Sequence, residues 1–282
     1  MEVYNDKISL QQAVASRRIK GSIGFVPTMG ALHQGHLSLI EQSAADNPCT
    51  VVSIFVNPTQ FNNSQDLEKY PRDLNADIDL IQSTVKSDIV IFAPSVAEMY
   101  HNKLTADSFN FDGLDQQMEG AYRPGHFDGV GTIVFKLFEL VRPNCAYFGE
   151  KDFQQLQIIR KLVSIKNIAI EIKGHPIIRE KSGLAKSSRN QLLSEKEREE
   201  ARIIFEVLNK VKNKFNGINT HELKQFVKDC FDFHPLFQLD YFEICDETSL
   251  QPLLEYDSTK KYRAFVAIYA GEIRLIDNMQ LN

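Results

Sequence analysis

Apolar and polar positions alternate along the first part of the chain in a way that predicts a parallel β-sheet. Five short apolar runs have the length of buried strands, at residues 23–26, 50–56, 88–93, 145–148 and 169–172. Between them lie amphipathic segments of helical length, the clearest at residues 37–45, 74–85, 130–141 and 153–165. Strands that alternate with helices are typical of βαβ units, whose strands run parallel.

The pattern changes after about residue 176. Two helices are expected there, a charged one at residues 194–216 and another at residues 220–230, and strand-like runs follow at residues 239–245, 263–269 and 273–276. Ala270-Gly271-Glu272 has the composition of a hairpin turn between the last two runs. We therefore expect an α/β protein with a Rossmann-like parallel sheet in residues 1–175. A smaller α+β domain, a lid, is expected in residues 176–282, with residues 173–189 as the joint.

Length and composition exclude several classes of protein. The 282 residues are 43% hydrophobic and 24% charged, as in folded globular chains of about two domains. The net charge of −5 argues against nucleic acid as a partner, because such binding needs a basic surface. Residues 1–10 are too polar for a signal peptide, and no apolar stretch approaches the ~20 residues that span a membrane. We expect a cytoplasmic protein without a membrane partner, in which a local basic patch for a small anion remains open.

The run from Pro27 to His36 is the most informative motif of the chain. It reads Pro-Thr-Met-Gly-Ala-Leu-His-Gln-Gly-His and lies between a predicted strand and a predicted helix. Glycine lets the backbone approach a ligand, a helix N-terminus offers free N–H groups to an anion, and imidazoles add donors. The run therefore predicts a phosphate site. His36 falls near the helix N-terminus, where the dipole disfavours imidazolium, so we expect it to be a neutral donor.

Two other interpretations of this run fail on the residues around it. Gly30 and Gly35 have the spacing of a P-loop, but His36-Leu37 stands where a P-loop has Lys-Ser/Thr. His33 and His36 lack the glutamate of a zinc-protease helix, and the four cysteines contain no C-x-x-C pair. We therefore expect no metal site built by the protein. A turn whose histidines only cap the helix remains open as an alternative.

Two basic motifs are suited to phosphate as well. Gly149-Glu150-Lys151-Asp152 lies at another strand-to-helix junction, where a lysine can neutralise phosphate charge. The alternative there is a solvated helix start, with Asp152 as the cap and Lys151 on the surface. Lys186-Ser187-Ser188-Arg189 joins hydroxyl donors to a guanidinium in a loop, and such a loop can hold and release a polyphosphate.

Polar amides follow the second predicted strand. Asn57 and Gln60 are suited to bind a hydroxyl or a carboxylate rather than to transfer protons. Asn57-Pro58 is also a common turn signal, so turn chemistry is the alternative. The later cluster from Glu119 to Phe127 indicates a structured loop near the site.

The order of these motifs resembles a known superfamily. His33-Gln34-Gly35-His36 and the late Lys186-Ser187-Ser188-Arg189 resemble the H-I-G-H and K-M-S-K-S motifs of nucleotidyltransferases. A narrower likeness, to the pantoate–β-alanine ligase family, covers nearly the whole chain. It rests on blocks in the family's order, at residues 26–33, 55–61, 70–72, 123–127, 148–156, 187–190 and 274–278.

The resemblance implies an ATP-dependent ligase that joins pantoate to β-alanine. In the implied route, pantoate attacks ATP to give pantoyl adenylate and pyrophosphate, and β-alanine then displaces AMP. Mg²⁺ carried by ATP and a homodimer formed through the N-terminal domain are implied as well. Two alternatives remain open: a nucleotidyltransferase that adenylylates a phosphate substrate, and an ATP-binding protein without turnover.

The resemblance also implies roles for individual residues. The implied catalytic residues are His36, His33, Lys151 and Arg189. The implied ATP-binding residues are Met29, Gly30, Ala31, Leu32, His33, Gln34, Gly35, His36, Gly149, Glu150, Lys151, Asp152, Ile178, Lys186, Ser187, Ser188 and Arg189. Gln60 and Gln155 are implied to bind pantoate. Lys186 stands where the family more often has Met or Leu, which either adds a cation near the nucleotide or changes an apolar contact.

Overall fold

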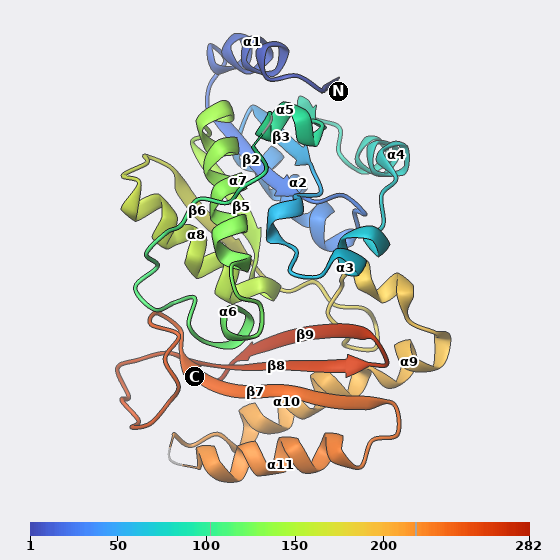
Figure 1. Ribbon diagram of the computed structural model, residues 1–282, viewed down its shortest axis with the longest axis vertical. Helices are drawn as coiled ribbons and strands as arrows, with labels where there is room; N and C mark the ends of the chain where they lie inside the picture. Colours follow the sequence, from blue (N-terminus) through green and yellow to red (C-terminus); the bar gives the residue numbers. More distant parts are fainter. Residues whose placement is uncertain (102, 218) are drawn as a thin grey trace.

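A computed structural model describes residues 1–101, 103–217 and 219–282 of the chain. Within these residues, six strands form a parallel sheet in the order β1-β4-β3-β2-β5-β6 (Figure 1). The strands are β1 (Glu2–Tyr4), β2 (Ile23–Thr28), β3 (Cys49–Ile54), β4 (Ile89–Phe92), β5 (Cys145–Gly149) and β6 (Glu171–His175). The predicted α/β fold with a parallel sheet is thereby confirmed.

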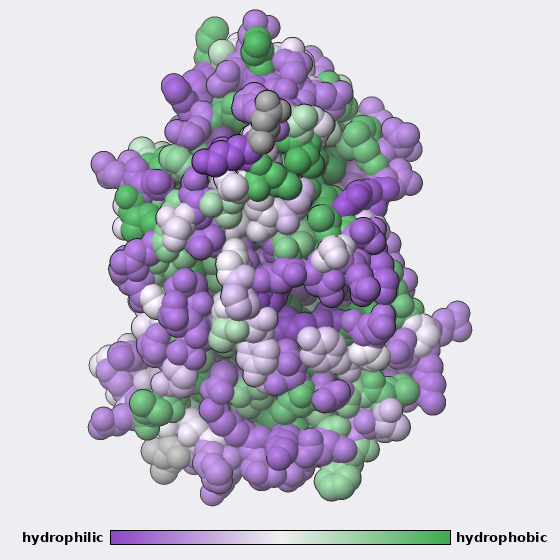
Figure 2. All heavy atoms as spheres, in the orientation of Figure 1, coloured by the Kyte–Doolittle hydropathy of each residue, from purple (hydrophilic) through white to green (hydrophobic). Residues whose placement is uncertain are grey.

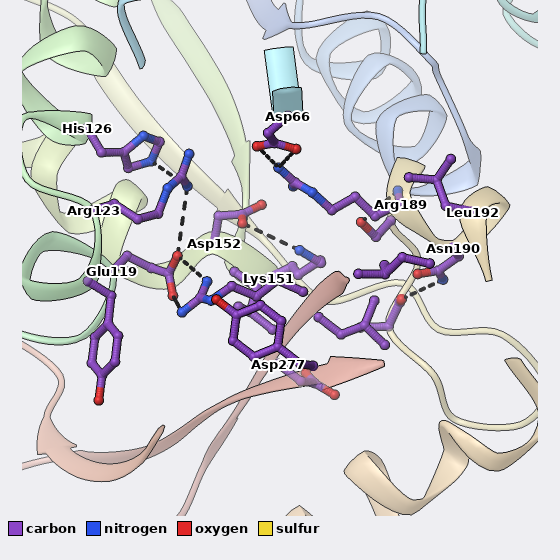
Figure 3. Close-up of a pocket in the computed structure, with 18 of the residues that line it drawn as sticks. Asp66, Glu119, Arg123, His126, Lys151, Asp152, Arg189, Asn190, Leu192 and Asp277 are labelled. Atoms are coloured by element: carbon purple, nitrogen blue, oxygen red, sulfur yellow. Dashed lines mark hydrogen bonds and ion pairs between the residues drawn. The ribbon is translucent and has the colours of Figure 1, made fainter. Parts of the chain in front are cut away.

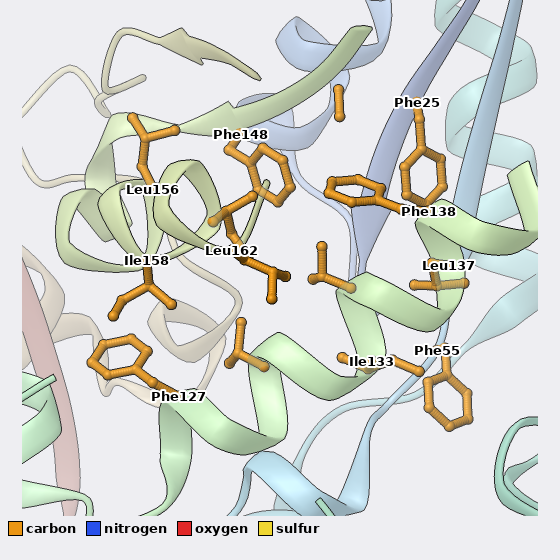
Figure 4. Close-up of a cluster of buried hydrophobic side chains, with 14 of the residues drawn as sticks. Phe25, Phe55, Phe127, Ile133, Leu137, Phe138, Phe148, Leu156, Ile158 and Leu162 are labelled. Atoms are coloured by element: carbon orange, nitrogen blue, oxygen red, sulfur yellow. The ribbon is translucent and has the colours of Figure 1, made fainter. Parts of the chain in front are cut away.

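Helices cover both faces of this sheet because successive side chains of its buried strands point to opposite sides. Phe25 packs with residues of α1 (Lys7–Arg18), α7 (His126–Val141) and α8 (Phe153–Ile165). Its neighbour Val26 packs with residues of α2 (Gln34–Asp46) and α4 (Leu74–Thr84). Figure 4 shows the first cluster, in which Phe25, Phe138 and Phe148 lie between the sheet and the helices.

In the described part of residues 176–282, a second sheet of three antiparallel strands lies between two layers (Figure 1). Its strands are β7 (Phe237–Asp246), β8 (Tyr262–Ala270) and β9 (Ile273–Gln280). Val266 and Ile268 of β8 pack with α10 (Arg202–Lys214) and α11 (Thr220–Asp232). Phe265 and Ala267 face the other way and belong to the core of the parallel sheet. The small domain is therefore packed on the large one through apolar side chains.

Short helices occupy the connections between these elements. They are η1 (Pro58–Gln60), α3 (Ser64–Lys69), α5 (Val96–Tyr100), α6 (Met118–Tyr122), η2 (Glu150–Asp152), η3 (Ser188–Leu192) and α9 (Glu195–Glu200). Among the helices that the structure describes, each is too short or too polar to cross a membrane.

Several predicted elements differ from the observed ones. The charged helix expected at residues 194–216 is two helices, because the exposed α9 ends where Ala201 and Ile204 turn into the core of the small domain. The last strand of the parallel sheet runs over Glu171–His175, later than the expected 169–172, because its polar residues pair with β5. Strand β1 and helix α1 were not predicted, since only Leu10, Ala13 and Val14 of α1 are buried. The domain boundary after residue 175 stays a prediction.

Candidate active site

The predicted motifs meet where the order of the parallel sheet reverses. Strand β2 pairs with β3 on one side and with β5 on the other. The chain leaves β2 into α2 and leaves β5 into α8, and these helices lie on opposite faces of the sheet. At such a point the two connections diverge and leave a crevice at the carboxyl ends of the strands. The turn before His33 and the turn at Lys151 flank this crevice.

Two connected cavities lie at this edge. One, of about 240 Å³, is lined by these predicted residues: Met29, His33, Gly35, His36, Gln60, Gly149, Lys151, Asp152, Gln155, Ile178, Lys186, Ser187, Ser188 and Arg189. The other, of about 750 Å³, shares Lys151 and Arg189 with it and extends toward the small sheet (Figure 3). Figure 2 shows hydrophilic side chains gathered across the middle of this face, between the two domains. Five predicted residues line neither cavity: Gly30, Ala31, Leu32, Gln34 and Glu150.

The two histidines cap helix α2 and still face the cavity. His33 is the N-cap, and its Nδ1 accepts the N–H of Gly35 at 3.1 Å. His36 Nδ1 accepts the N–H of His33 at 3.3 Å, which completes a capping box. Because both Nδ1 atoms are acceptors, the ring protons lie on Nε2. In the described part of the chain neither Nε2 has a partner, so capping and ligand binding are compatible roles of these rings.

Both imidazoles are neutral near pH 7. Burial, followed by the electrostatic effects of His36, Lys151 and Lys186, lowers the pKa of His33 to about 2. Burial also lowers the pKa of His36 to about 4, where Asp152 acts in the opposite direction and Lys151 in the same one. The expected neutral state of His36 thus has a physical cause beyond the helix dipole. The ring centroids are 4.1 Å apart, so the two rings lie side by side in the cavity wall.

The turn before these histidines is held by a residue that sequence analysis missed. Asp77 of α4, 4% exposed, accepts the N–H of Ala31 at 3.0 Å and that of Leu32 at 2.6 Å. Ala31 has φ +49°, a conformation that costs energy for a residue with a side chain. Gly30 has φ +81°, which glycine adopts freely. The N–H groups of Ala31 and Leu32 therefore already have an anionic partner within the protein.

Lys151 belongs to the cavity wall rather than to the open surface. It lies in η2, directly after β5, and its side chain is 19% exposed. Its Nζ lies 3.4 Å from Asp152 Oδ1. Asp152 precedes α8 but makes no side-chain cap, so the helix-cap alternative lacks its main contact. The ammonium group is thus placed beside the two histidines, whose pKa values it lowers.

The Ser-Ser-Arg loop closes the opposite side of the site. Ser187 caps η3 by accepting the N–H of Arg189 at 3.3 Å. Ser188 Oγ donates to the carbonyl of Ala31 at 3.0 Å, which ties this loop to the turn before His33. Arg189 pairs with Asp66 of α3 at 2.9 Å (Figure 3). The backbone N–H of Lys186 donates to the carbonyl of Ile178 at 2.9 Å, so both residues are fixed at the cavity rim.

Gln60 is anchored by its backbone and by its side chain. Its carbonyl accepts Nδ1–H of His126 at 2.7 Å and Nη2–H of Arg123 at 3.3 Å. Its side chain contacts Met29 Sδ at 2.8 Å and accepts from Asn57 Nδ2 at 3.2 Å. A carbonyl only accepts, so His126 carries its proton on Nδ1, and Nε2 faces Arg123 at 3.2 Å. The amide of Gln60 is thereby held at the cavity. Gln155 lines both cavities.

The loop expected near the site, from Glu119 to Phe127, also joins the two domains. Glu119 accepts Arg274 Nη1 at 2.7 Å and Nη2 at 2.9 Å, and Tyr241 donates to it at 2.9 Å. Arg123 Nη1 lies 3.8 Å from the same carboxylate. The sequence indicated the cluster from Glu119 to Phe127 and the block at residues 274–278, but not their contact, because the partners of Glu119 lie in the distant β7 and β9.

The described residues include no group of three or more His, Cys, Asp or Glu side chains that could hold a metal ion. Magnesium that arrives with a nucleotide needs no such group, because phosphates and water supply most of its ligands. Asp152, beside Lys151 in the cavity wall, is the carboxylate available to such an ion.

Comparison with known proteins gives the family. The model of the family "Pantoate-beta-alanine ligase" matches residues 2–280. The chain belongs to this family. Pantothenate synthetase of Christiangramia forsetii is 50% identical over 100% of both chains, and that of Flavobacterium psychrophilum is 53% identical over 92% of each. The predicted family is confirmed, its activity is the ligation of pantoate to β-alanine, and neither alternative function is favoured.

Solved structures agree with the family assignment. The crystal structure of pantothenate synthetase from Thermus thermophilus aligns with a TM-score of 0.90 at 39% identity, covering 100% of this chain and 99% of that one. The ligase from Francisella tularensis, crystallised with "Beta-gamma ATP and Beta-alanine", aligns with a TM-score of 0.82 at 36% identity, over 99% and 97% of the two chains.

Proposed function

We propose that this ligase works through a pantoyl adenylate. The carboxylate of pantoate attacks the α-phosphorus of ATP, and the bond to pyrophosphate breaks. The amine of β-alanine then attacks the acyl carbon, loses a proton and displaces AMP. A carboxylate is a poor acceptor for an amine, and adenylation supplies the leaving group that it lacks. The ATP and β-alanine named for the Francisella structure are the reactants that this route needs besides pantoate.

One observation carries this proposal: two neutral imidazoles, whose Nδ1 atoms are engaged in capping and whose Nε2–H groups are free within the described part of the chain, line the same cavity as Lys151. A neutral donor binds a phosphate oxygen less tightly than a cation does, so it does not slow the release of the product. Lys151 and Arg189 then stabilise the negative charge that develops on the transferred phosphoryl group. His36, His33, Lys151 and Arg189 keep the catalytic roles expected of them.

The remaining predicted contacts follow from the cavity wall. Gly35, Gly149, Ile178, Lys186 and Ser187 border the nucleotide, and the amides of Gln60 and Gln155 bind pantoate. Lys186 acts as an additional cation, because its charge already lowers the pKa of His33. Mg²⁺ would arrive with ATP and help to neutralise the phosphate charge, and Asp152 in the cavity wall would be the side chain able to hold it. We also propose a homodimer and a cytoplasmic location, with four free cysteines in keeping with a reducing compartment.

Pantoate-dependent exchange of labelled pyrophosphate into ATP tests the first step. We expect Lys151→Ala to slow this exchange about 10²–10³-fold, the usual effect of losing one donor to transition-state charge. Lys161→Ala is the matched control, because Lys161 of the same region pairs with Asp112 and lines neither cavity. An unchanged rate in Lys151→Ala contradicts its role. An absolute need for β-alanine in the exchange contradicts the order of the two steps.

A further inference from the structure

Strand β9 presents one row of side chains to the large domain. Asn278 pairs in register with Phe265 of β8, and Ile276 pairs with Ala267. Phe265 and Ala267 belong to the core of the parallel sheet, and Ile276 packs against it. Asn278 lies on this same face and is 2% exposed. A polar amide is thus buried at the junction of the two domains, where its contacts must be fully satisfied.

The amide of Asn278 binds the turn that carries Lys151. Its Nδ2 donates to the carbonyl of Glu150 at 2.9 Å and to the carbonyl of Lys151 at 2.8 Å. Its Oδ1 accepts Nη1–H of Arg263 at 2.6 Å. Arginine is only a donor, so Oδ1 must face Arg263 and the NH₂ group must face the carbonyls. Each polar atom of this side chain therefore has a partner that the opposite orientation would lose.

Arg263 is itself held rigidly. Its Nε donates to Glu247 at 2.7 Å, and its guanidinium lies 3.9 Å above the ring of Phe153, the first residue of α8. Its Nη2 lies 3.6 Å from the carboxylate of Glu150. This explains why Glu150 lines neither cavity: its side chain is directed to Arg263. The turn at residues 150–152 is thus connected to β8 and β9 through buried, charge-assisted contacts.

We propose that Asn278 is a positioning residue for the ligation reaction: its amide fixes the backbone of Lys151, and so directs the ammonium group into the phosphate cavity from the other domain. The inference rests on the proposed role of Lys151. Helix η2 has no side-chain cap at its N-terminus, and the donor contacts from Asn278 of β9 hold its carbonyl groups instead. The sequence block at residues 274–278 resembled the family without indicating a role, and this contact supplies one.

The test replaces the amide without changing its shape. Asn278→Asp puts an oxygen in place of the NH₂ group, so two carbonyl oxygens lose their donor. Asn278→Ser is a second, neutral variant that is too short to reach both carbonyls. Gln280→Glu is the matched control, because it makes the same chemical change on the same strand, where Gln280 is exposed and contacts Asn282. Pyrophosphate exchange, the KM for ATP and pantoate, and urea unfolding are measured for each folded variant.

We expect Asn278→Asp and Asn278→Ser to lower kcat of the exchange by roughly 10–100-fold with little change in KM, since a displacement of about 1 Å has such effects. Gln280→Glu should exchange at the wild-type rate. The double variants with Lys151→Ala should be no slower than Lys151→Ala alone, because Asn278 acts through Lys151. If Asn278 had a purely structural role, the fold-losses in exchange rate of the two single variants would multiply in the double variant, and that result overturns the proposal.

Different results would refute the role of Asn278 and the role of Lys151. A slow Lys151→Ala together with a wild-type rate for Asn278→Ser refutes the positioning role and leaves the role of Lys151 intact. A wild-type rate for Lys151→Ala refutes the role of Lys151 itself. If Asn278→Asp does not fold, Asn278→Ser carries the same comparison without an added charge.

Discussion

Asp77→Asn should loosen the turn that precedes His33 and His36. The Asp77 carboxylate accepts two backbone N–H groups, from Ala31 and Leu32. An asparagine of the same shape offers one oxygen and one NH₂ group, so one of these N–H groups would face another donor. Ala31 has φ +49°, and the contacts to Asp77 and Ser188 hold it in that conformation. The substitution therefore removes a restraint from a strained residue.

The expected magnitude follows from the lost contact. A buried N–H left without an acceptor costs about 1–3 kcal/mol, and the lost bond is to a charged group, which places the effect toward the upper end. The matched control is Asp79→Asn, because Asp79 is an exposed carboxylate on the same helix. Exposed substitutions of this kind change the free energy of unfolding by less than about 0.5 kcal/mol.

Urea unfolding at a pH near 7.5 measures the free energy difference, and steady-state kinetics measures kcat/KM for ATP. We expect both quantities to fall in Asp77→Asn and to stay unchanged in Asp79→Asn. Stability that falls without any change in kcat/KM would show that the turn does not position the histidines. If the two variants unfold at the same urea concentration, the contacts of Asp77 with Ala31 and Leu32 contribute nothing, and the reasoning fails.

Two further predictions concern the charges around the site. Asp66→Asn should lower the KM for ATP by roughly 1.5–5-fold, because Arg189 must leave this partially exposed ion pair to reach phosphate; an unchanged KM argues against that exchange of partners. Burial, followed by Arg123, lowers the pKa of His126 to about 4. As the pH falls, His126 therefore takes up a proton in the unfolded chain before it does so in the folded protein. The contribution of neutral His126 to the free energy of unfolding is complete above about pH 6.5. It is lost toward pH 4, by up to ~1.4 kcal/mol per pH unit. When the free energy of unfolding is measured with urea at several pH values in this range, it should depend less steeply on pH in His126→Gln than in the wild type. An equal pH dependence contradicts the assignment.

The elements of the large domain could be predicted where their signals are local. Helix α8 begins and ends at the expected residues, Phe153 and Ile165, because its apolar positions recur with the helical period over its whole length. The hairpin turn at Gly271 joins β8 and β9 as expected. Strand β1 gave no such signal, since it has three residues at the sheet edge. Its pairing with β4 stabilises it, rather than any pattern of its own.

The candidate site, like the elements, could be predicted where its motifs are local in the sequence. The motifs at residues 33–36 and 149–152 reach one crevice because each follows the carboxyl end of a strand. The motif at residues 186–189 reaches it through the contact of Ser188 with Ala31. The two interpretations of His33 and His36 turned out to describe different nitrogens of the same rings. Sequence reasoning treated capping and ligand binding as alternatives, since it could not place Nδ1 and Nε2 separately.

Local sequence patterns predict most of the helices and strands and the residue types that line the candidate site. What holds these residues in place depends on the tertiary structure. Asp77 binds a turn 46 residues away, Asn278 a turn 127 residues away, and Arg274 a carboxylate 155 residues away. Helical and strand periods depend on neighbours within a few residues, so the sequence displays them directly. Contacts over such separations exist only once the sheet order and the docking of the small domain have brought the partners together.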